Sequence, residues 1–284
     1  MFKTKPFVSE KVWGYERWIV SVHQAGQSAV DDTVPQIGGK ALGEVIGSSY
    51  PLLIKIIQAN ETLSVQVHPD DEYAQLHEKS AGKTECWYVL DAVPDAAIIY
   101  GLNKAYSRSE LETALKDNAI QDCLRFVPVS KGDFIFIPAG TVHAIRGGLR
   151  LLEIQQSSDI TYRLYDWGRP REIHVKKGLD VIRHLPDSIL TPEHPFSGKI
   201  ICPYFTLEKK DFTVEETFSC SEFNTPAAKT GWCSICILAG KGALKTAGET
   251  TLRVEAEDCI MTAQNAVISA IPDEGHTLSI MMMG

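Results

Sequence analysis

The sequence predicts an all-β protein with two β-barrels and a few peripheral helices. Short apolar or alternating runs recur along the chain and are separated by Gly, Pro, Asp and Asn, the pattern of short strands joined by turns. At 284 residues the chain is long enough for one or two domains with sizeable cores. The expected strands lie at 52–57, 62–68, 85–90, 96–100, 134–137, 150–156, 204–211, 234–239, 251–254, 259–262, 266–270 and 277–282.

A weak internal repeat favours two barrels over one. Residues 131–139 match 257–263 in pattern, and residues 86–92 match 233–240. We therefore expect a barrel with helical insertions within residues 1–185, a proline-containing linker at 186–203 and a second barrel within 204–284.

Three segments are expected to be helical. Residues 72–78 read as a helix between two strands. Ser107 and Glu110 have the spacing of a capping box, followed by apolar Leu111, Leu115 and Leu124. Residues 171–184 carry a third set of apolar positions, and we expect this helix to cover the outside of the first barrel.

Residues 132–143 are the most informative segment. Glycine, five residues and then Pro-x-Gly-x-x-His place His143 after a strand and a tight turn. This spacing is similar to the second signature of the cupin β-barrels, in which the histidine binds a metal, so two cupin-type (jelly-roll) barrels are expected. The second copy has Val267 or Ile268 where His143 falls, so we expect it to be metal-free.

Further candidate ligands lie upstream of this motif. Gln66 and His68 would share one face of a strand because side chains alternate, and Glu85 lies on the following strand. Two imidazoles, a carboxylate and an amide oxygen suit zinc, iron, manganese or cobalt, and they leave room for water or substrate. Each residue alone would be an ordinary polar strand residue. Their occurrence together with the His143 spacing favours a metal site.

One departure from the cupin pattern is the gap of sixteen residues between His68 and Glu85. Several segments, this gap included, closely resemble the type I mannose-6-phosphate isomerases, and the chain is most similar to the short bacterial class. The resemblance runs from about residue 10 to about residue 185. Its segments are 50–57, 63–71, 82–88, 138–144 and 155–169.

The resemblance implies a set of site residues. One divalent ion per chain, normally zinc, would be held by Gln66, His68, Glu85 and His143. Arg163 would be the essential active-site arginine of the family, and Lys83 would line the pocket. Glu153 falls near the position of a family pocket carboxylate.

Composition excludes several classes of partner. The net charge of −8 disfavours nucleic acid and anionic membranes. It does not exclude a sugar phosphate, because Lys83, Arg163 and Arg169 offer local cations. There is no phosphate-cradling GxxxxGK[ST] loop and no GxGxxG after a strand, so nucleotide cofactors are not expected.

The cysteines and the termini predict a cytoplasmic protein. No apolar run is long enough to span a membrane, and residues 1–7 do not resemble a signal peptide. Seven cysteines scattered through expected strands read as reduced core thiols. Cys233 and Cys236 have CxxC spacing but would lie on opposite faces of a strand, which disfavours a metal or redox role.

The predicted function is a metal-dependent aldose-ketose isomerase that interconverts mannose 6-phosphate and fructose 6-phosphate. The metal would polarise sugar oxygens, Arg163 would stabilise developing charge and Lys83 would be a pocket cation. The base is left open between Glu153 and a metal-bound hydroxide. Two alternatives are an iron-dependent cupin dioxygenase and a catalytically silent sugar-binding regulatory cupin. The protein is expected to be a monomer or homodimer.

Overall fold

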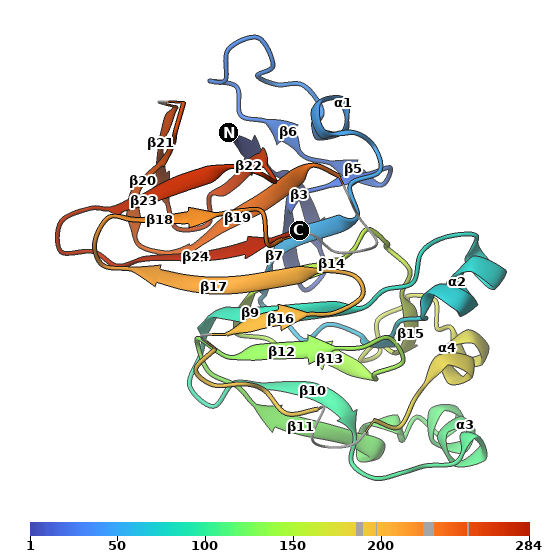
Figure 1. Cartoon of the computed structure of the whole chain (residues 1–284). Coiled ribbons are helices and arrows are strands. Elements are labelled where there is room, and N and C mark those ends of the chain that lie inside the picture. Colours follow the sequence, from blue (N-terminus) through green and yellow to red (C-terminus); the bar gives the residue numbers. More distant parts are fainter. Residues whose placement is uncertain (186–189, 197, 224–229, 249) are drawn as a thin grey trace. The chain divides into compact units, whose positions relative to one another are not determined.

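The computed structural model describes residues 1–185, 190–196, 198–223, 230–248 and 250–284 (Figure 1). Residues 186–189 and 197 of the predicted linker lie outside this part. The chain separates into two compact units. The terminal unit comprises Met1–Val8, Arg17–Ile54 and Phe196–Gly284, and the central unit comprises Ser9–Glu16 and Lys55–Pro195.

Each unit consists of segments that are separated in the sequence but contact one another. Most of the first 54 residues group with the C-terminal strands, whereas the predicted domains followed the internal repeat. The repeat-based boundaries stay a prediction. Within the predicted linker, Lys199–Ile201 forms strand β16. It pairs antiparallel with the next strand, with Ile200 opposite Leu207.

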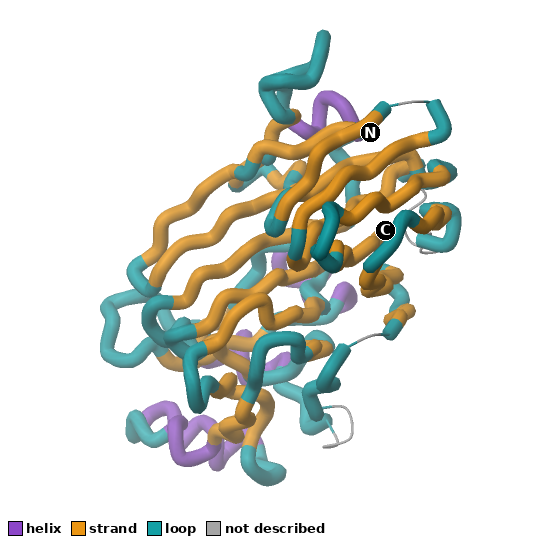
Figure 2. The backbone as a smooth tube through the Cα atoms, turned by 90° about the vertical axis from the view of Figure 1, so that its left-hand side faces the viewer, coloured by secondary structure: helices purple, strands orange, loops and turns teal. Residues whose placement is uncertain are grey.

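The prediction of an all-β protein with few helices is confirmed: strands dominate the described chain and pair antiparallel (Figure 2). Every run expected from the sequence overlaps a strand, although the bounds differ, as at 62–68, where β8 covers only Val65–Val67. No helix in the described ranges is both long enough and apolar enough to span a membrane.

The central unit contains one complete antiparallel sheet and most of a second, whose strands β7, β3 and β2 belong to it only in part. One has the order β11-β10-β13-β8-β15, and the other has the order β12-β9-β14-β7-β3-β2. The strands of the first are β11 Leu124–Pro128, β10 Ala97–Leu102, β13 His143–Ile145, β8 Val65–Val67 and β15 Tyr162–Tyr165. Those of the second are β12 Phe134–Ile137, β9 Glu85–Ala92, β14 Leu149–Gln156, β7 Leu52–Ala59, β3 Gly14–Val20 and β2 Phe7–Lys11.

Both sheets of the central unit contribute to one hydrophobic core. Trp87 and Ile135 come from the second sheet, and Tyr100 and Ile145 come from the first. Their burial removes apolar surface from water, and burying one large apolar side chain contributes roughly 1.5–3 kcal/mol to the stability of the fold. The candidate metal ligands described below lie on strands of these same two sheets or directly after one, so a packed core fixes their backbone.

The terminal unit repeats this architecture. Its larger sheet has the order β16-β17-β24-β19-β22-β1-β6, and its smaller one β18-β23-β20-β21. The remaining strands of the larger sheet are β17 Thr206–Phe212, β24 Leu278–Met283, β19 Trp232–Ala239, β22 Cys259–Ala263, β1 Phe2–Lys5 and β6 Ala29–Val30. The smaller sheet and a separate hairpin contain β18 Glu216–Ser219, β23 Val267–Pro272, β20 Lys241–Thr246, β21 Thr251–Glu255, β4 Val22–His23 and β5 Gly26–Gln27.

The helices are short. Helix α2, Asp71–Glu78, follows the prediction and begins at Asp70, whose side chain accepts a hydrogen bond from Tyr73 N at 2.9 Å. Helix α3, Arg108–Lys116, begins at the predicted capping box. Leu124 does not belong to it, because a 3₁₀ turn at Ile120–Cys123 intervenes and Leu124 starts β11. Helix α1, Leu42–Ile46, was not predicted.

The expected helix at 171–184 is too long. Helix α4 covers only Val175–Val181, and it packs on β15 and β8. Residues before it are held along β15 instead: His174 N donates to Arg163 O at 2.7 Å, and Arg163 Nη1 donates to Glu172 O at 2.7 Å. These bonds to a strand replace the helical ones, so the helix starts one turn later.

All seven cysteines are free thiols, and all except Cys202 are buried. Cys233 and Cys236 both lie in β19. Cys236 faces Cys259 of β22, with 3.1 Å between the sulfur atoms, while Cys233 pairs in register with Thr262. The two cysteines of the CxxC spacing therefore point to different neighbours.

Candidate metal centre and active site

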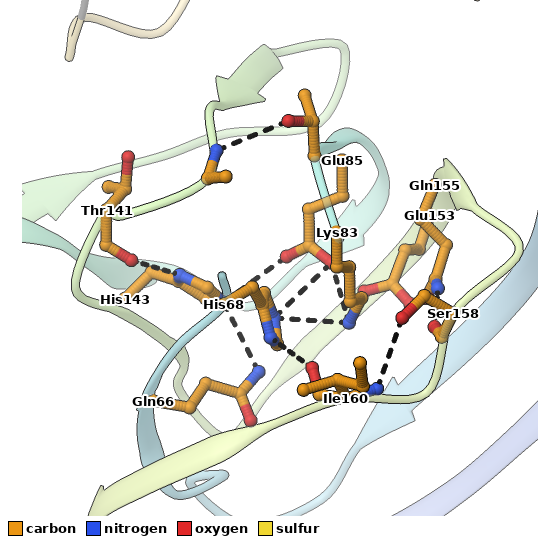
Figure 3. Close-up of polar contacts among 12 residues, drawn as sticks. Gln66, His68, Lys83, Glu85, Thr141, His143, Glu153, Gln155, Ser158 and Ile160 are labelled. Carbon is orange, nitrogen blue, oxygen red and sulfur yellow. Dashed lines mark hydrogen bonds and ion pairs between the residues drawn. The ribbon is translucent and has the colours of Figure 1, made fainter. Parts of the chain in front are cut away.

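Strand β8 brings the candidate ligands together. Gln66 lies opposite His143 of β13 on one side and opposite Arg163 of β15 on the other. Directly opposed residues in antiparallel strands project to the same face of the sheet. His68 follows β8 on that face, and its ring centroid lies 4.8 Å from that of His143. Glu85 at the start of β9 completes a buried cluster whose ligand atoms lie within 4.8 Å of one another (Figure 3).

Both histidines have one ring nitrogen fixed by a backbone carbonyl. His68 Nδ1 lies 2.8 Å from Ile160 O, and His143 Nδ1 lies 2.8 Å from Thr141 O (Figure 3). A carbonyl accepts only, so Nδ1 must carry the proton and the Nε2 lone pair is left for another partner. Burial, followed by the charge of Lys83, lowers the pKa of His68 well below its usual value. The neutral form that binds metals is therefore favoured.

Glu85 is the anionic member of the cluster. Lys83 Nζ lies 2.8 Å from its Oε2, and His143 Nε2 lies 3.3 Å from its Oε1. Burial would raise the pKa of this carboxyl, but the attraction of Lys83, followed by that of His68 and His143, outweighs burial and lowers it well below the usual value. Glu85 is therefore ionised, which is the form that coordinates a metal.

The distances around Glu85 satisfy ion pairing but not hydrogen bonding. Neither carboxylate oxygen of Glu85 has a hydrogen-bond partner of acceptable geometry, although both are buried. Among the described residues, the other buried side-chain atoms without a hydrogen-bond partner are Gln155 Oε1 and Arg163 Nε. Because buried polar atoms are almost always paired in folded proteins, the two unpaired oxygens of Glu85 indicate a missing ligand. An ionised carboxylate beside two Nε2 lone pairs fits a divalent cation.

Gln66 is placed as a fourth candidate ligand. Its amide nitrogen lies 3.3 Å from His143 Nε2. The oxygen and nitrogen of an amide are interchangeable by a flip, so the same position serves the amide oxygen when a cation is present. The four ligands expected from the sequence thus converge at one face, and Lys83 lies beside them, 3.1 Å from His68 Nε2.

Glu153 lies on β14, and each of its carboxylate oxygens accepts one hydrogen bond. Its Oε1 accepts a hydrogen bond from Lys55 Nζ at 3.0 Å, and its Oε2 accepts one from Trp87 Nε1 at 3.1 Å. The Trp87 ring in turn contacts the ring of His143 edge-on, with centroids 5.5 Å apart. Burial lowers the pKa of Lys55, but Glu153 and Glu16 outweigh it and raise the pKa above its usual value, so Lys55 is charged.

Arg163 emerges beside Gln66 but is held away from direct contact with the cluster by its own neighbours. Its Nη1 donates to Glu172 O, and its Nε lies 4.0 Å from Asp166 Oδ2. Arg169, the other cation considered from the sequence, is tied to Asp166 Oδ1 at 2.9 Å and to Thr62 O at 2.7 Å.

Three residues of the site were not found from the sequence. Lys55 pairs with Glu153, which is distant in sequence, whereas Asp166 is bound by the nearby Arg169 and Arg171. Gln155 lies opposite Glu85, and its amide nitrogen donates to the carbonyls of Gln156 and Ser158 at 2.9 and 2.5 Å, which fixes the orientation of its unpaired oxygen (Figure 3). A charged or amide residue in an otherwise apolar strand run was the available signal for Lys55 and Gln155.

Comparison with known proteins places the chain in a family. The family model for the phosphomannose isomerase type I catalytic domain matches residues 3–91 of this chain. Mannose-6-phosphate isomerase ManA of Bacillus subtilis is 39% identical over 244 residues, covering 72% of this chain and 77% of that protein. Mannose-6-phosphate isomerase of Streptococcus mutans is 44% identical over 184 residues, covering 59% and 57%.

The fold gives the same result over the whole chain. The crystal structure of mannose 6-phosphate isomerase from Bacillus subtilis aligns with a TM-score of 0.84 at 27% identity, covering 100% of this chain and 99% of that one. The dioxygenase and the silent regulatory protein considered from the sequence are not favoured by these relatives. The resemblance seen in the motifs is confirmed, and the chain belongs to the type I phosphomannose isomerase family.

Proposed function

We propose that this chain interconverts mannose 6-phosphate and fructose 6-phosphate at the face formed by β8, β13 and the start of β9. The observation that supports this most strongly is the buried His68, Glu85 and His143 cluster, with its unpaired carboxylate, in a member of this family. We propose that Gln66 completes the ligand set and that the ion is zinc, because two imidazoles with a carboxylate are a typical zinc donor set.

The reaction moves a proton between C1 and C2 of the open-chain sugar. When bound, a divalent ion supplies Lewis-acid polarisation of the sugar oxygens. Lys83, with Nζ 2.8 Å from Glu85, keeps that carboxylate ionised and offers further N–H donors to sugar oxygens. Arg163 has an unpaired buried Nε and stabilises the negative charge that develops during proton transfer.

Glu153 is the proposed base. Lys55 and Trp87 each occupy one lone pair of the carboxylate, and a carboxylate has further acceptor positions. Its variant Glu153→Gln keeps an acceptor for Trp87 and loses the charge. We expect kcat to fall by roughly 10²–10⁴-fold with metal content unchanged. Unchanged kcat would place the base elsewhere.

The environment of the protein is also a proposal. Six buried free cysteines and one partly buried one suit a reducing compartment, and we place the protein in the cytoplasm. Its state as a monomer or homodimer stays a prediction.

A coupled assay tests the function. Purified protein should form fructose 6-phosphate from mannose 6-phosphate, lose this activity on treatment with a chelator and regain it on addition of zinc or another divalent ion. Oxygen consumption in place of isomerisation, or absence of turnover in metal-loaded protein, would refute the proposal.

A further inference from the structure

Three arginines gather around one buried carboxylate just after β15. The Asp166 side chain is only 1% exposed. Arg171 donates to both of its oxygens, from Nε to Oδ2 at 2.6 Å and from Nη2 to Oδ1 at 2.7 Å. Arg169 adds a bond from Nε to Oδ1 at 3.1 Å. Burial would raise the pKa of Asp166, but Arg171 and Arg169 outweigh it and lower the pKa, so the carboxylate is ionised.

Arg163 forms a long ion pair with this carboxylate but no hydrogen bond. Its Nε lies 4.0 Å from Asp166 Oδ2 and is buried without a hydrogen-bond partner. Its register opposite Gln66 sends the side chain out on the face of the metal cluster. An arginine this close to a carboxylate ordinarily forms a two-bonded pair with it. Something must prevent that pairing here.

The other partners of Asp166 explain why Arg163 does not form a hydrogen-bonded pair with it. Arg171 takes one position on each oxygen in the two-bonded geometry, and Arg169 takes another on Oδ1. Three guanidinium groups around one carboxylate leave an excess of positive charge. Burial, followed by the charge of Arg171, lowers the pKa of Arg163, and the charges of Asp166 and Glu172 offset this only in part. Such a group attracts an anion.

We propose that Arg171 is a positioning residue that saturates Asp166 and thereby keeps the donors of Arg163 available to anionic oxygens of the substrate. This rests on the proposed function. Arg171 need not touch the substrate. Without it, Oδ2 of Asp166 loses its 2.6 Å partner, and Arg163 Nε is the neighbouring donor that replaces it.

A double-variant cycle tests this capture. Arg171→Met should lower kcat/KM by at least about tenfold with metal content unchanged, because a charge-stabilising donor is withdrawn. Adding Asp166→Asn removes the charge that captures Arg163, so Arg171→Met/Asp166→Asn should recover most of the loss. A merely structural role for Arg171 predicts that the second substitution adds to the loss.

A matched pair in the terminal unit provides the control. Arg253 donates to Asp273 at 2.6 Å there. Arg253→Met and Arg253→Met/Asp273→Asn should leave kcat/KM unchanged. Where Arg171→Met does not fold, as judged by circular dichroism, Arg171→Gln takes its place in the cycle.

The outcomes separate this inference from the proposed function. Wild-type activity in the Arg171 variant, or additive losses in the double variant, would overturn the positioning role. A wild-type protein that does not isomerise mannose 6-phosphate would instead overturn the function. Recovery of activity in the double variant supports both.

Discussion

The two units share an architecture and differ in what they bury. Each packs two antiparallel sheets around a hydrophobic cluster. Every buried lysine, histidine, aspartate or glutamate among the described residues lies in the central unit: Lys55, His68, Lys83, Glu85, Asp133, His143, Glu153 and Asp166. The buried polar side chains of the terminal unit are serines and threonines: Thr4, Ser21, Ser28, Thr206, Ser234, Thr262 and Ser279.

This difference separates packing from function. Burial of a charged group costs several kcal/mol unless it is paired, so a core that only has to be stable excludes such groups. The core of the terminal unit satisfies that requirement with Met, Phe, Ile and Cys side chains. The central unit departs from it on the face where the unpaired atoms of Glu85, Gln155 and Arg163 lie.

The largest expected effect comes from removing a ligand in the central unit. His143→Ala should lose the metal and lower kcat/KM by roughly 10⁴-fold, because a catalytic metal contributes several kcal/mol to transition-state stabilisation. Metal analysis and the coupled assay measure this. Cys233→Ser in the terminal unit is the control and should retain the metal. Equal metal loss in both variants would mean that the CxxC spacing holds the ion.

The next effect concerns the buried ion pair of the central unit. Lys55→Met leaves Glu153 charged and buried without its cation, so unfolding free energy should fall by about 3–5 kcal/mol. Chemical denaturation measures the change. The double variant Lys55→Met/Glu153→Leu should recover part of this stability while remaining inactive. If Lys55→Met were as stable as wild type, the ion pair between Lys55 and Glu153 would contribute little to the unfolding free energy.

Arg163 tests whether charge stabilisation depends on geometry. Arg163→Lys keeps the charge but loses the planar, multi-donor group. We expect kcat to fall by roughly 10²-fold, with KM and metal content little changed. A raised KM with preserved kcat would instead identify Arg163 as a uniform phosphate clamp.

The smallest effect belongs to the terminal unit. Ile260→Val removes one methylene from a fully buried position and should lower the unfolding free energy by about 0.5–1.5 kcal/mol. Metal content and kcat of the folded variant should not change. A selective loss of metal or kcat would show that the apolar unit takes part in the site.

The sequence predicted the strands that alternate strongly or are fully apolar, and it missed the others for physical reasons. Strand β3 contains Tyr15, Glu16 and Arg17 in succession, which breaks the alternation, and β13 and β15 are only three and four residues long. The pairing of β13 and β15 with β8 supplies the stability that their own pattern does not reveal.

The candidate site divides in the same way. The spacing of the motifs identified Gln66, His68, Glu85 and His143, because alternation and a tight turn are local properties. The role of Lys55 depends on a contact with Glu153, which is 98 residues away. Arg171 contacts Asp166, five residues before it, in a segment that was expected to begin a helix but precedes α4. No local pattern carries that information.

The most direct test of the central claim is a metal titration of chelated protein, followed by isomerase activity and metal content in the same samples. The claim is that the charged cluster of the central unit holds one ion on which turnover depends. Activity should rise in proportion to bound metal and reach its plateau at about one ion per chain, and the His143→Ala variant should show no rise. Full activity in the metal-free protein, or a plateau that His143→Ala also reaches, would contradict the account.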